Sequence, residues 1–151
     1  MTAAANVNQR VVQGQTAQVR RSLRRLRELA RLPEEEFLSG PDNYAIAEHH
    51  LRRCLEAMLD MGRHLIARCG LGAAQEYADV PRLLAEAGAL TSDTANDAAA
   101  LAKLRNRLVH FYWQVDAEEM HQVLSERLST VESFCREVLD WLAEQAAENG
   151  V

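Results

Sequence analysis

The sequence has 151 residues, of which 48% are hydrophobic, and its formal net charge is −5. This length and composition fit a single soluble domain over residues 1–151, because a chain of this size can bury a core of its own. No apolar run approaches the roughly 20 residues of a membrane span, and the start, MTAAANVNQR, lacks the apolar stretch of a secretory signal. Membrane and secreted proteins are therefore disfavoured, and a cytoplasmic location is expected. Residues 1–6 and 147–151 are expected to be frayed.

The charge is unevenly distributed along the chain. Residues 10–31 hold seven arginines against the single acidic residue Glu28, whereas residues 116–148 hold nine acidic residues against two arginines. The first of these segments predicts a helix from about Val7 to Leu32, closed by Pro33. Its arginine side is either solvated or in contact with phosphate or an acidic partner, and the sequence leaves both possibilities open. The apolar side consists of Val12, Val19, Leu23, Leu26 and Ala30, and the arginine side of Arg20, Arg24, Arg27 and Arg31.

The following elements are also predicted to be helical, since no segment shows the alternation of β-branched residues that a half-buried strand needs. Residues 33–43, PEEEFLSGPDN, are expected to form a loop. A second long helix is expected from Tyr44 to a left-handed cap at Gly70. A short third helix is expected between Asp79, a candidate N-cap, and Gly88.

A fourth helix is expected to begin around Thr91 and to contain residues 104–112, LRNRLVHFY. A fifth begins at Asp116, where Asp116 and Glu119 have the spacing of a capping box, and continues through Trp141. Four long helices and one short helix predict an all-α bundle.

No metal or cofactor site is expected. The three cysteines are an odd number without C-x-x-C spacing, which favours reduced, packed thiols over a disulfide framework or a zinc site. His49 and His50 are adjacent and therefore diverge around a helix, and no carboxylate or cysteine pattern completes a site with them. The cysteines are Cys54, Cys69 and Cys135.

The fourth helix combines an apolar stripe with polar residues on its other sides. At about 100° per residue, Asn106 and His110 lie together roughly opposite the stripe, and Arg105 lies on a flank. The stripe that is expected to face the core consists of Leu101, Leu104, Leu108 and Phe111. The neighbours of Asn106 and His110 are Ala99, Ala102 and Lys103, and the small ones permit another helix to approach closely.

Two interpretations of these polar residues remain open. In the first, His110 is a surface histidine near a helix C-terminus and Arg105 pairs with a nearby carboxylate. In the second, two copies pack about a two-fold axis through this face and bring both sets of Arg105, Asn106 and His110 to a shared cleft. An imidazole that titrates near neutrality, a guanidinium that binds phosphate and an orienting amide are the composition of a metal-independent phosphodiester-cleaving site.

This segment resembles the motif of the HEPN superfamily, and within it that of the HepT-like toxins of the HepT/MntA toxin–antitoxin pair. The family motif is Arg, usually followed by Asn, then His after a gap of four to six residues, and Tyr two residues later. Here these positions are Arg105, Asn106, His110 and Tyr112. The stretches AEHHLRRCLEAMLDMGRHLIARCG and LLAEAGALT extend the resemblance over roughly residues 44–123. Pro81 and the arginine content of the first helix depart from the family pattern.

The resemblance implies a HEPN-type bundle and a homodimeric, metal-independent endoribonuclease, restrained by an MntA-like nucleotidyltransferase antitoxin. In that family Arg105 would bind the scissile phosphate of the RNA, His110 would transfer a proton, and Asn106 would hold either residue in place. Tyr112 matches the tyrosine to which the antitoxin transfers adenylyl groups, and such a modification would block an RNA phosphate by bulk and negative charge.

Three further residues are candidates for the lining of the cleft: Asp60 and His64, one turn apart, and Lys103. Buried anchoring or surface pairing is the alternative for Asp60 and His64. Three functions are weighed: a ribonuclease toxin, a catalytically silent binding subunit of a nucleotidyltransferase complex, and a structural bundle. The intact motif disfavours the structural bundle but does not separate the other two.

Overall fold

The computed structural model describes residues 6–148, and all the regular elements in that range are helical. The elements are α1 (Gln9–Ala30), α2 (Glu34–Ser39), α3 (Asn43–Cys69), α4 (Asp79–Glu86), α5 (Ser92–His110), the 3₁₀ turn η2 (Tyr112–Gln114), α6 (Ala117–Glu126) and α7 (Leu128–Glu148). The expected all-α bundle is therefore confirmed. Of the ends that we expected to be frayed, residues 1–5 and 149–151 lie outside the described residues, and α7 is helical through Glu148.

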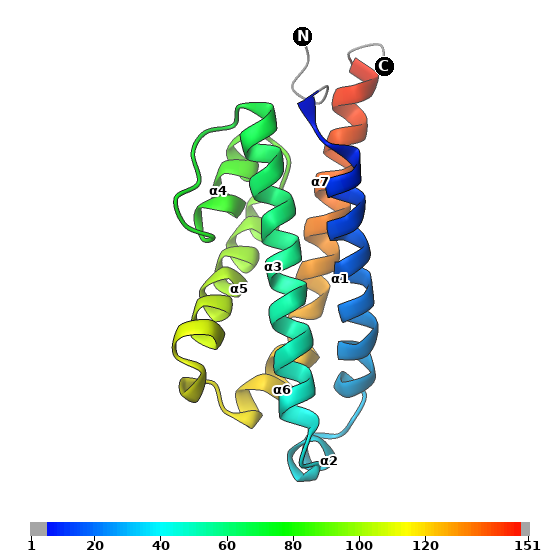
Figure 1. Ribbon diagram of the computed structural model, residues 1–151, viewed down its shortest axis with the longest axis vertical. Helices are drawn as coiled ribbons and strands as arrows, with labels where there is room; N and C mark the ends of the chain where they lie inside the picture. The colour runs from blue at the N-terminus through cyan, green and yellow to red at the C-terminus, as the bar shows by residue number, and fades with distance from the viewer. Residues whose placement is uncertain (1–5, 149–151) are drawn as a thin grey trace.

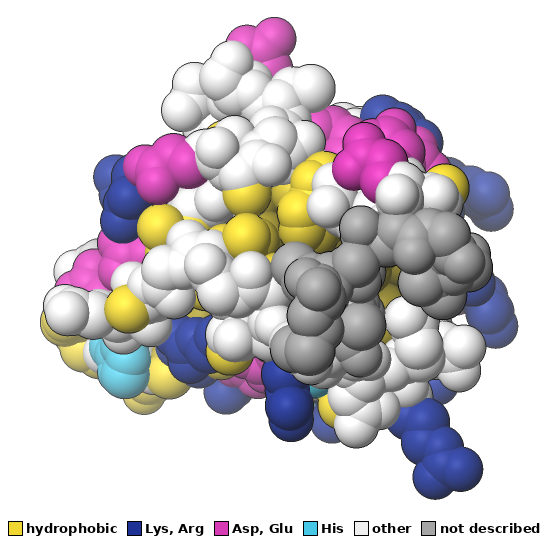
Figure 2. Space-filling view, turned by 90° about the horizontal axis from the view of Figure 1, so that it is seen from above, with side chains coloured by type: hydrophobic (Ala, Val, Ile, Leu, Met, Phe, Trp, Pro, Cys, Tyr) yellow, Lys and Arg dark blue, Asp and Glu magenta, His cyan; other side chains and the backbone are white. Residues whose placement is uncertain are grey.

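The long helices α1, α3, α5 and α7 run along the long axis of the molecule (Figure 1). α3 lies in the middle and packs against α1, α4, α5 and α7, while α2 and α6 lie towards the end opposite the two termini. Seen from the end that carries the termini, hydrophobic side chains lie in the centre and charged side chains lie around the edge (Figure 2). No helix within the described range is long and apolar enough to cross a membrane.

Helix α1 is fixed against α3 by its apolar side. Asn8 is the N-cap, and its side-chain oxygen accepts a hydrogen bond from the backbone N–H of Arg10 at 3.0 Å, so the helix begins after Val7 rather than at it. The arginine side of α1 is exposed, as both interpretations of it require. One of its members, Arg27, forms an ion pair with Glu132 of α7. The buried apolar residues of α1 are Val12, Val19, Leu23, Leu26 and Leu29.

The sequence prediction also missed one helix and joined two others into one. The segment that was expected to be a loop contains α2, whose three N-terminal glutamates are favoured by the helix dipole and whose Phe37 is only 1% exposed. The expected fifth helix is two helices, α6 and α7, which meet at Arg127. A six-residue helix with one buried side chain has no measurable apolar period, and no Gly or Pro marks the break at Arg127.

The connection from α3 to α4 is partly as predicted. Gly70 takes the left-handed conformation, with φ of 65°, and Pro81 lies in the first turn of α4. Asp79 is the first residue of α4 rather than its cap. Its Oδ2 accepts backbone N–H groups from Gln75 and Glu76 at 3.1 and 3.0 Å, and the bond from Glu76 is the main reason why the pKa of its carboxyl is lowered.

Helix α5 buries most of the predicted stripe. Leu101, Leu104 and Leu108 are 2%, 7% and 1% exposed. Phe111 is 47% exposed, because the chain leaves the helix there with φ of −139° and turns the ring off the stripe. Ala102, which was expected on the outward face, is fully buried within the chain. Ala102 is therefore unavailable for contact with another copy.

None of the three cysteines forms a disulfide within the described residues. Cys54 and Cys135 are buried, and burial raises the pKa of their thiols to about 12 and about 11. Both thiols are therefore protonated near neutral pH and behave as packed apolar groups.

Candidate functional site

The guanidinium of Arg105 is partly buried and is held from three directions. Its Nε and Nη2 donate to Oε1 of Glu56 on α3 at 3.3 and 3.2 Å, and its Nη1 donates to Oδ1 of Asn106 at 3.2 Å. Its central carbon lies 4.7 Å from the centre of the Tyr77 ring. With 18% of its side chain exposed, Arg105 keeps an open edge while its orientation is fixed.

Tyr77 is itself held in place. Its hydroxyl donates to Oδ1 of Asp60 at 2.7 Å, and a second guanidinium, that of Arg63, lies 4.5 Å from its ring centre. Burial, with the hydrogen bond to Asp60, raises the pKa of Tyr77 to about 12, so the phenol stays neutral. Asp60 is thus connected to Arg105 through Tyr77.

The other two candidates for the cleft lining lie elsewhere. His64 Nε2 accepts the backbone N–H of Asn8 at 3.1 Å, which anchors the start of α1. Burial lowers the pKa of His64 and favours the neutral ring that this bond requires. Lys103 is exposed and lines a small groove of about 200 Å³ between α5 and α6, together with Arg107 and Glu119.

The remaining motif residues lie at the C-terminal end of α5. His110 is the last residue of the helix and is exposed. Tyr112 and Trp113 follow in η2, with 60% and 66% of their surface exposed and ring centres 5.5 Å apart. His110 and Tyr112 are therefore open to solvent, whereas Arg105 is held against α3.

A clamp fixes the turn that carries Tyr112. Arg107 donates two hydrogen bonds to the carboxylate of Glu119 on α6, at 2.6 and 2.9 Å, and a third to the carbonyl of Gln114 at 3.1 Å. Asp116 accepts the backbone N–H of Glu119 at 2.8 Å, as a capping box requires. The carboxylate of Glu119 is directed to Arg107, so the two residues do not form a reciprocal box.

Sequence reasoning missed Glu56, Tyr77 and the clamp of Arg107. Glu56 lies one helical turn before Asp60 on α3, so the helical period that made Asp60 a candidate also indicates Glu56. Tyr77 lies in the irregular connection before α4, where no period applies. Within the described range, no group of three His, Cys, Asp or Glu side chains is placed to hold a metal ion.

The arrangement offers two kinds of chemistry on one helix. The guanidinium of Arg105 provides positive charge whose orientation is set before any ligand arrives, which is the requirement for stabilising charge that develops on a phosphate. The exposed imidazole of His110 is accessible for proton transfer.

Comparisons with known proteins identify relatives of this chain. The family profile described as Ribonuclease HepT-like matches residues 19–138. The tRNA nuclease HepT of Aphanizomenon flos-aquae (strain 2012/KM1/D3) is 23% identical over 144 residues, which cover 95% of this chain and 98% of that protein. The mRNA nuclease HepT of Shewanella oneidensis is 29% identical over 85 residues, which cover 56% of this chain and 64% of that protein.

Solved structures share the fold. A tri-AMPylated Shewanella oneidensis HEPN toxin in complex with an MNT antitoxin superposes with a TM-score of 0.78 at 22% identity, covering 86% of this chain and 97% of that one. A cytosolic protein of unknown function from Bacillus subtilis, YutE, gives a TM-score of 0.80 at 15% identity, covering 96% of this chain and 95% of that one. Since the profile spans most of the sequence, the chain belongs to the ribonuclease HepT-like family.

Proposed function

We propose that this protein is the toxin of a toxin–antitoxin pair and cleaves RNA without a metal ion. In this proposal Arg105 and His110 act at a cleft between two copies, and a nucleotidyltransferase antitoxin neutralises the toxin by adenylylating Tyr112. The observation that carries the proposal is the fixed, partly buried guanidinium of Arg105 on the same helix as an exposed imidazole. Membership of a ribonuclease family, and relatives named as tRNA and mRNA nucleases, support it.

The proposed reaction is attack by the neighbouring 2′-hydroxyl on the scissile phosphate. His110 of one copy takes the proton of the 2′-hydroxyl, the 2′-oxygen bonds to phosphorus, and the bond to the 5′-oxygen breaks. His110 of the other copy gives a proton to the departing 5′-oxygen. The products are a 2′,3′-cyclic phosphate and a 5′-hydroxyl. Arg105 stabilises the charge on the phosphate, and Asn106 holds the Nη1 edge of Arg105.

Two copies are needed in this proposal because Arg105 and His110 have different surroundings within one chain. Arg105 is held against α3, whereas His110 lies exposed at the helix end. Because Ala102 is buried, the proposed two-fold contact uses the C-terminal half of α5 and the exposed aromatic side chains next to it. Phe111, Tyr112 and Trp113 provide apolar area for that contact.

The proposed regulation rests on the position of Tyr112. Its side chain is exposed, and the clamp of Arg107 fixes the turn that carries it two residues after His110. An AMP group on this phenol would bring a phosphate and a nucleoside next to the site and would repel an incoming RNA phosphate. The AMPylated state of the HEPN toxin with a similar fold supports this assignment.

The test is RNA cleavage by purified protein free of antitoxin. His110→Ala should lower the rate by roughly 10² to 10⁴, the usual range for loss of a general acid–base group, and should leave the fold intact because the side chain is exposed. Arg105→Ala should also abolish cleavage, because it removes the positive charge that stabilises the phosphate. Arg82→Ala, at an exposed arginine of α4, is the control and should cleave like the wild type. A wild type that cleaves no RNA would instead favour a silent binding subunit.

A further inference from the structure

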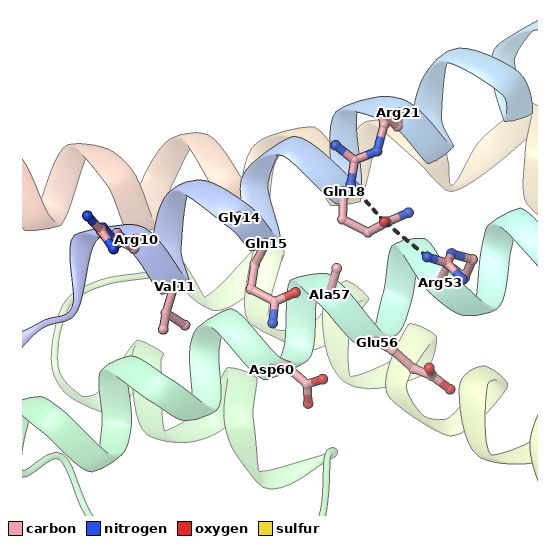
Figure 3. Close-up of a pocket in the computed structure, with 10 residues that line it drawn as sticks. All are labelled: Arg10, Val11, Gly14, Gln15, Gln18, Arg21, Arg53, Glu56, Ala57 and Asp60. Carbon is pink, nitrogen blue, oxygen red and sulfur yellow. Dashed lines mark hydrogen bonds between the residues drawn. The ribbon is translucent and has the colours of Figure 1, made fainter.

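A polar groove of about 510 Å³ lies between α1 and α3 (Figure 3). Arg10 and Arg21 of α1 and Arg53 of α3 line it, and the carboxylates of Glu56 and Asp60 lie on its α3 side. The other lining residues are Val11, Gly14, Gln15, Gln18 and Ala57.

This groove shares two residues with the surroundings of Arg105. The carboxylate of Glu56 accepts from Arg105, and Asp60 accepts the hydroxyl of Tyr77, whose ring lies against the same guanidinium. The groove therefore adjoins the proposed scissile phosphate position. Because Glu56 already pairs with Arg105, the three lining arginines outweigh the one remaining carboxylate, Asp60, in a chain whose net charge is negative.

The arginines on the two helices are linked through one amide. Oε1 of Gln18 accepts from Nη2 of Arg21 at 2.9 Å and from Nη2 of Arg53 at 3.3 Å (Figure 3). A shared acceptor holds two like charges close together and limits the rotamers of two flexible side chains. Two guanidinium groups held in this way match the closely spaced negative charges of a nucleic-acid backbone.

Gly14 is the second observation that points to a ligand. It lies inside α1, where glycine is less favourable than alanine, yet a Cβ added at this position meets no atom within 4 Å. Packing therefore does not require glycine here. Its effect is to leave one strip of the groove without a side chain, where an extended backbone can approach the helix.

We propose that this groove binds the phosphate backbone of single-stranded RNA beside the position that is cleaved, with Arg10, Arg21 and Arg53 contacting phosphates. The inference rests on the proposed ribonuclease function and extends it, because it assigns a path for the RNA outside the motif of α5. The partner is single-stranded because the arginines come from two neighbouring helices along a groove, which suits a flexible strand that can follow it.

The first experiment measures binding of the wild-type protein to a fluorescent 2′-O-methyl oligoribonucleotide, which lacks the 2′-hydroxyl nucleophile, at several salt concentrations. The groove variant carries Arg10→Ala, Arg21→Ala and Arg53→Ala together. Loss of three phosphate contacts should reduce the slope of log K against log salt by about 2, and affinity at about 0.1 M salt by roughly 100-fold. A charge-matched control carries Arg68→Ala, Arg82→Ala and Arg136→Ala, all exposed and outside this groove, and should keep the wild-type slope.

The second experiment uses Gly14, where loss of binding cannot be attributed to loss of folding. Gly14→Ala and Gly14→Glu should both raise the melting temperature, since both replace glycine by a better helix former. Gly14→Ala should bind the oligoribonucleotide like the wild type. Gly14→Glu should lose affinity, because it places a carboxylate in the open strip.

The outcomes separate this proposal from the nuclease function. Equal salt slopes in the groove variant and its charge-matched control would overturn the proposal that the groove binds RNA. A groove variant whose mass in light scattering shows that a dimer has dissociated would also overturn it. If the wild type cuts RNA while both groove experiments show no change, the nuclease function is supported and RNA binding by the groove is refuted. If the wild type binds the oligoribonucleotide through the groove but cuts no RNA, RNA binding by the groove is supported and the nuclease function is refuted. A wild type that neither binds nor cuts RNA overturns both.

Discussion

Replacement of Tyr77 by leucine tests whether the orientation of Arg105 controls the rate. Tyr77 does not belong to the motif, and its ring lies 4.7 Å from the central carbon of the Arg105 guanidinium. Tyr77→Leu removes the aromatic face and leaves Glu56 and Asn106 as the groups that hold Arg105. Tyr77→Phe is the matched control, because it keeps the ring and removes only the hydroxyl that donates to Asp60.

The expected loss in kcat/KM follows from the solvent exposure of the contact between Arg105 and Tyr77. Cation–π contacts contribute about 0.5–1 kcal/mol at exposed sites and about 2 kcal/mol or more when desolvated. The side chain of Arg105 is 18% exposed, which lies between these limits and gives about 1 kcal/mol. If that energy orients the guanidinium in the transition state, kcat/KM of Tyr77→Leu should fall about fivefold. Tyr77→Phe should stay within about twofold of the wild type, although loss of its hydrogen bond lowers stability by about 0.5–1.5 kcal/mol.

The assay is steady-state cleavage of a short RNA well below the melting temperature of each variant. The expected result is a fall in kcat/KM for Tyr77→Leu with wild-type behaviour for Tyr77→Phe. Equal kcat/KM in all three proteins would refute the argument, since Glu56 and Asn106 would then be sufficient to orient Arg105. A loss in Tyr77→Phe as large as that in Tyr77→Leu would assign the effect to the Asp60 hydrogen bond instead of the ring.

Four other predictions follow from the site and the fold. After coexpression with the partner nucleotidyltransferase, intact mass should increase by one or more AMP units, and Tyr112→Phe should remove the increase; a label that survives the substitution contradicts the assignment. Sedimentation at micromolar concentration should show a dimer, and a monomer would exclude a shared cleft. Cleavage should continue in EDTA and leave a 2′,3′-cyclic phosphate or its hydrolysis product. Burial raises the pKa of Glu137, but hydrogen bonds from Thr91 and Thr94 lower it overall, so its contribution to stability is present above the ordinary carboxylate range and lost as the pH falls through the lowered pKa. Glu137→Gln should therefore flatten the urea midpoint against pH in that acidic window, and an unchanged pH dependence would contradict this.

Apolar periodicity and glycine identified the long helices because these signals depend on local spacing. Leu101, Leu104 and Leu108 are buried as their period predicts, and Gly70 takes the predicted left-handed conformation. The period does not show where a helix ends without Gly or Pro, so the core position expected for Phe111 was wrong. Ala102 was placed on the outward face by angle alone. In the structure the neighbouring helices surround more of α5 than its leucine stripe covers, because alanine packs closely on either side.

The sequence indicates the motif residues of the proposed site, but it does not indicate the residues that orient Arg105. Arg105, Asn106 and His110 follow one another on α5, so their relation is local. Glu56 and Tyr77 reach Arg105 only after α3 and the connection to α4 pack beside α5, and their contacts depend on tertiary packing. Of the predicted cleft residues, Asp60 and His64 share a face of α3, yet only Asp60 is connected with Arg105, through Tyr77. His64 instead accepts a hydrogen bond from the backbone N–H of Asn8.

The clamp formed by Arg107 and Glu119 separates two arginines that look alike in the sequence. Arg105 is held by Glu56, Asn106 and Tyr77 within the proposed site, whereas Arg107 is held by Glu119 and by the turn that follows the helix. A change at Glu119 on α6 would therefore release the turn that carries Tyr112, the proposed site of modification, while every residue of the motif stays in place. A survey of related sequences for members that are regulated at this tyrosine should accordingly ask for an acidic partner at the position of Glu119 as well as for the motif itself.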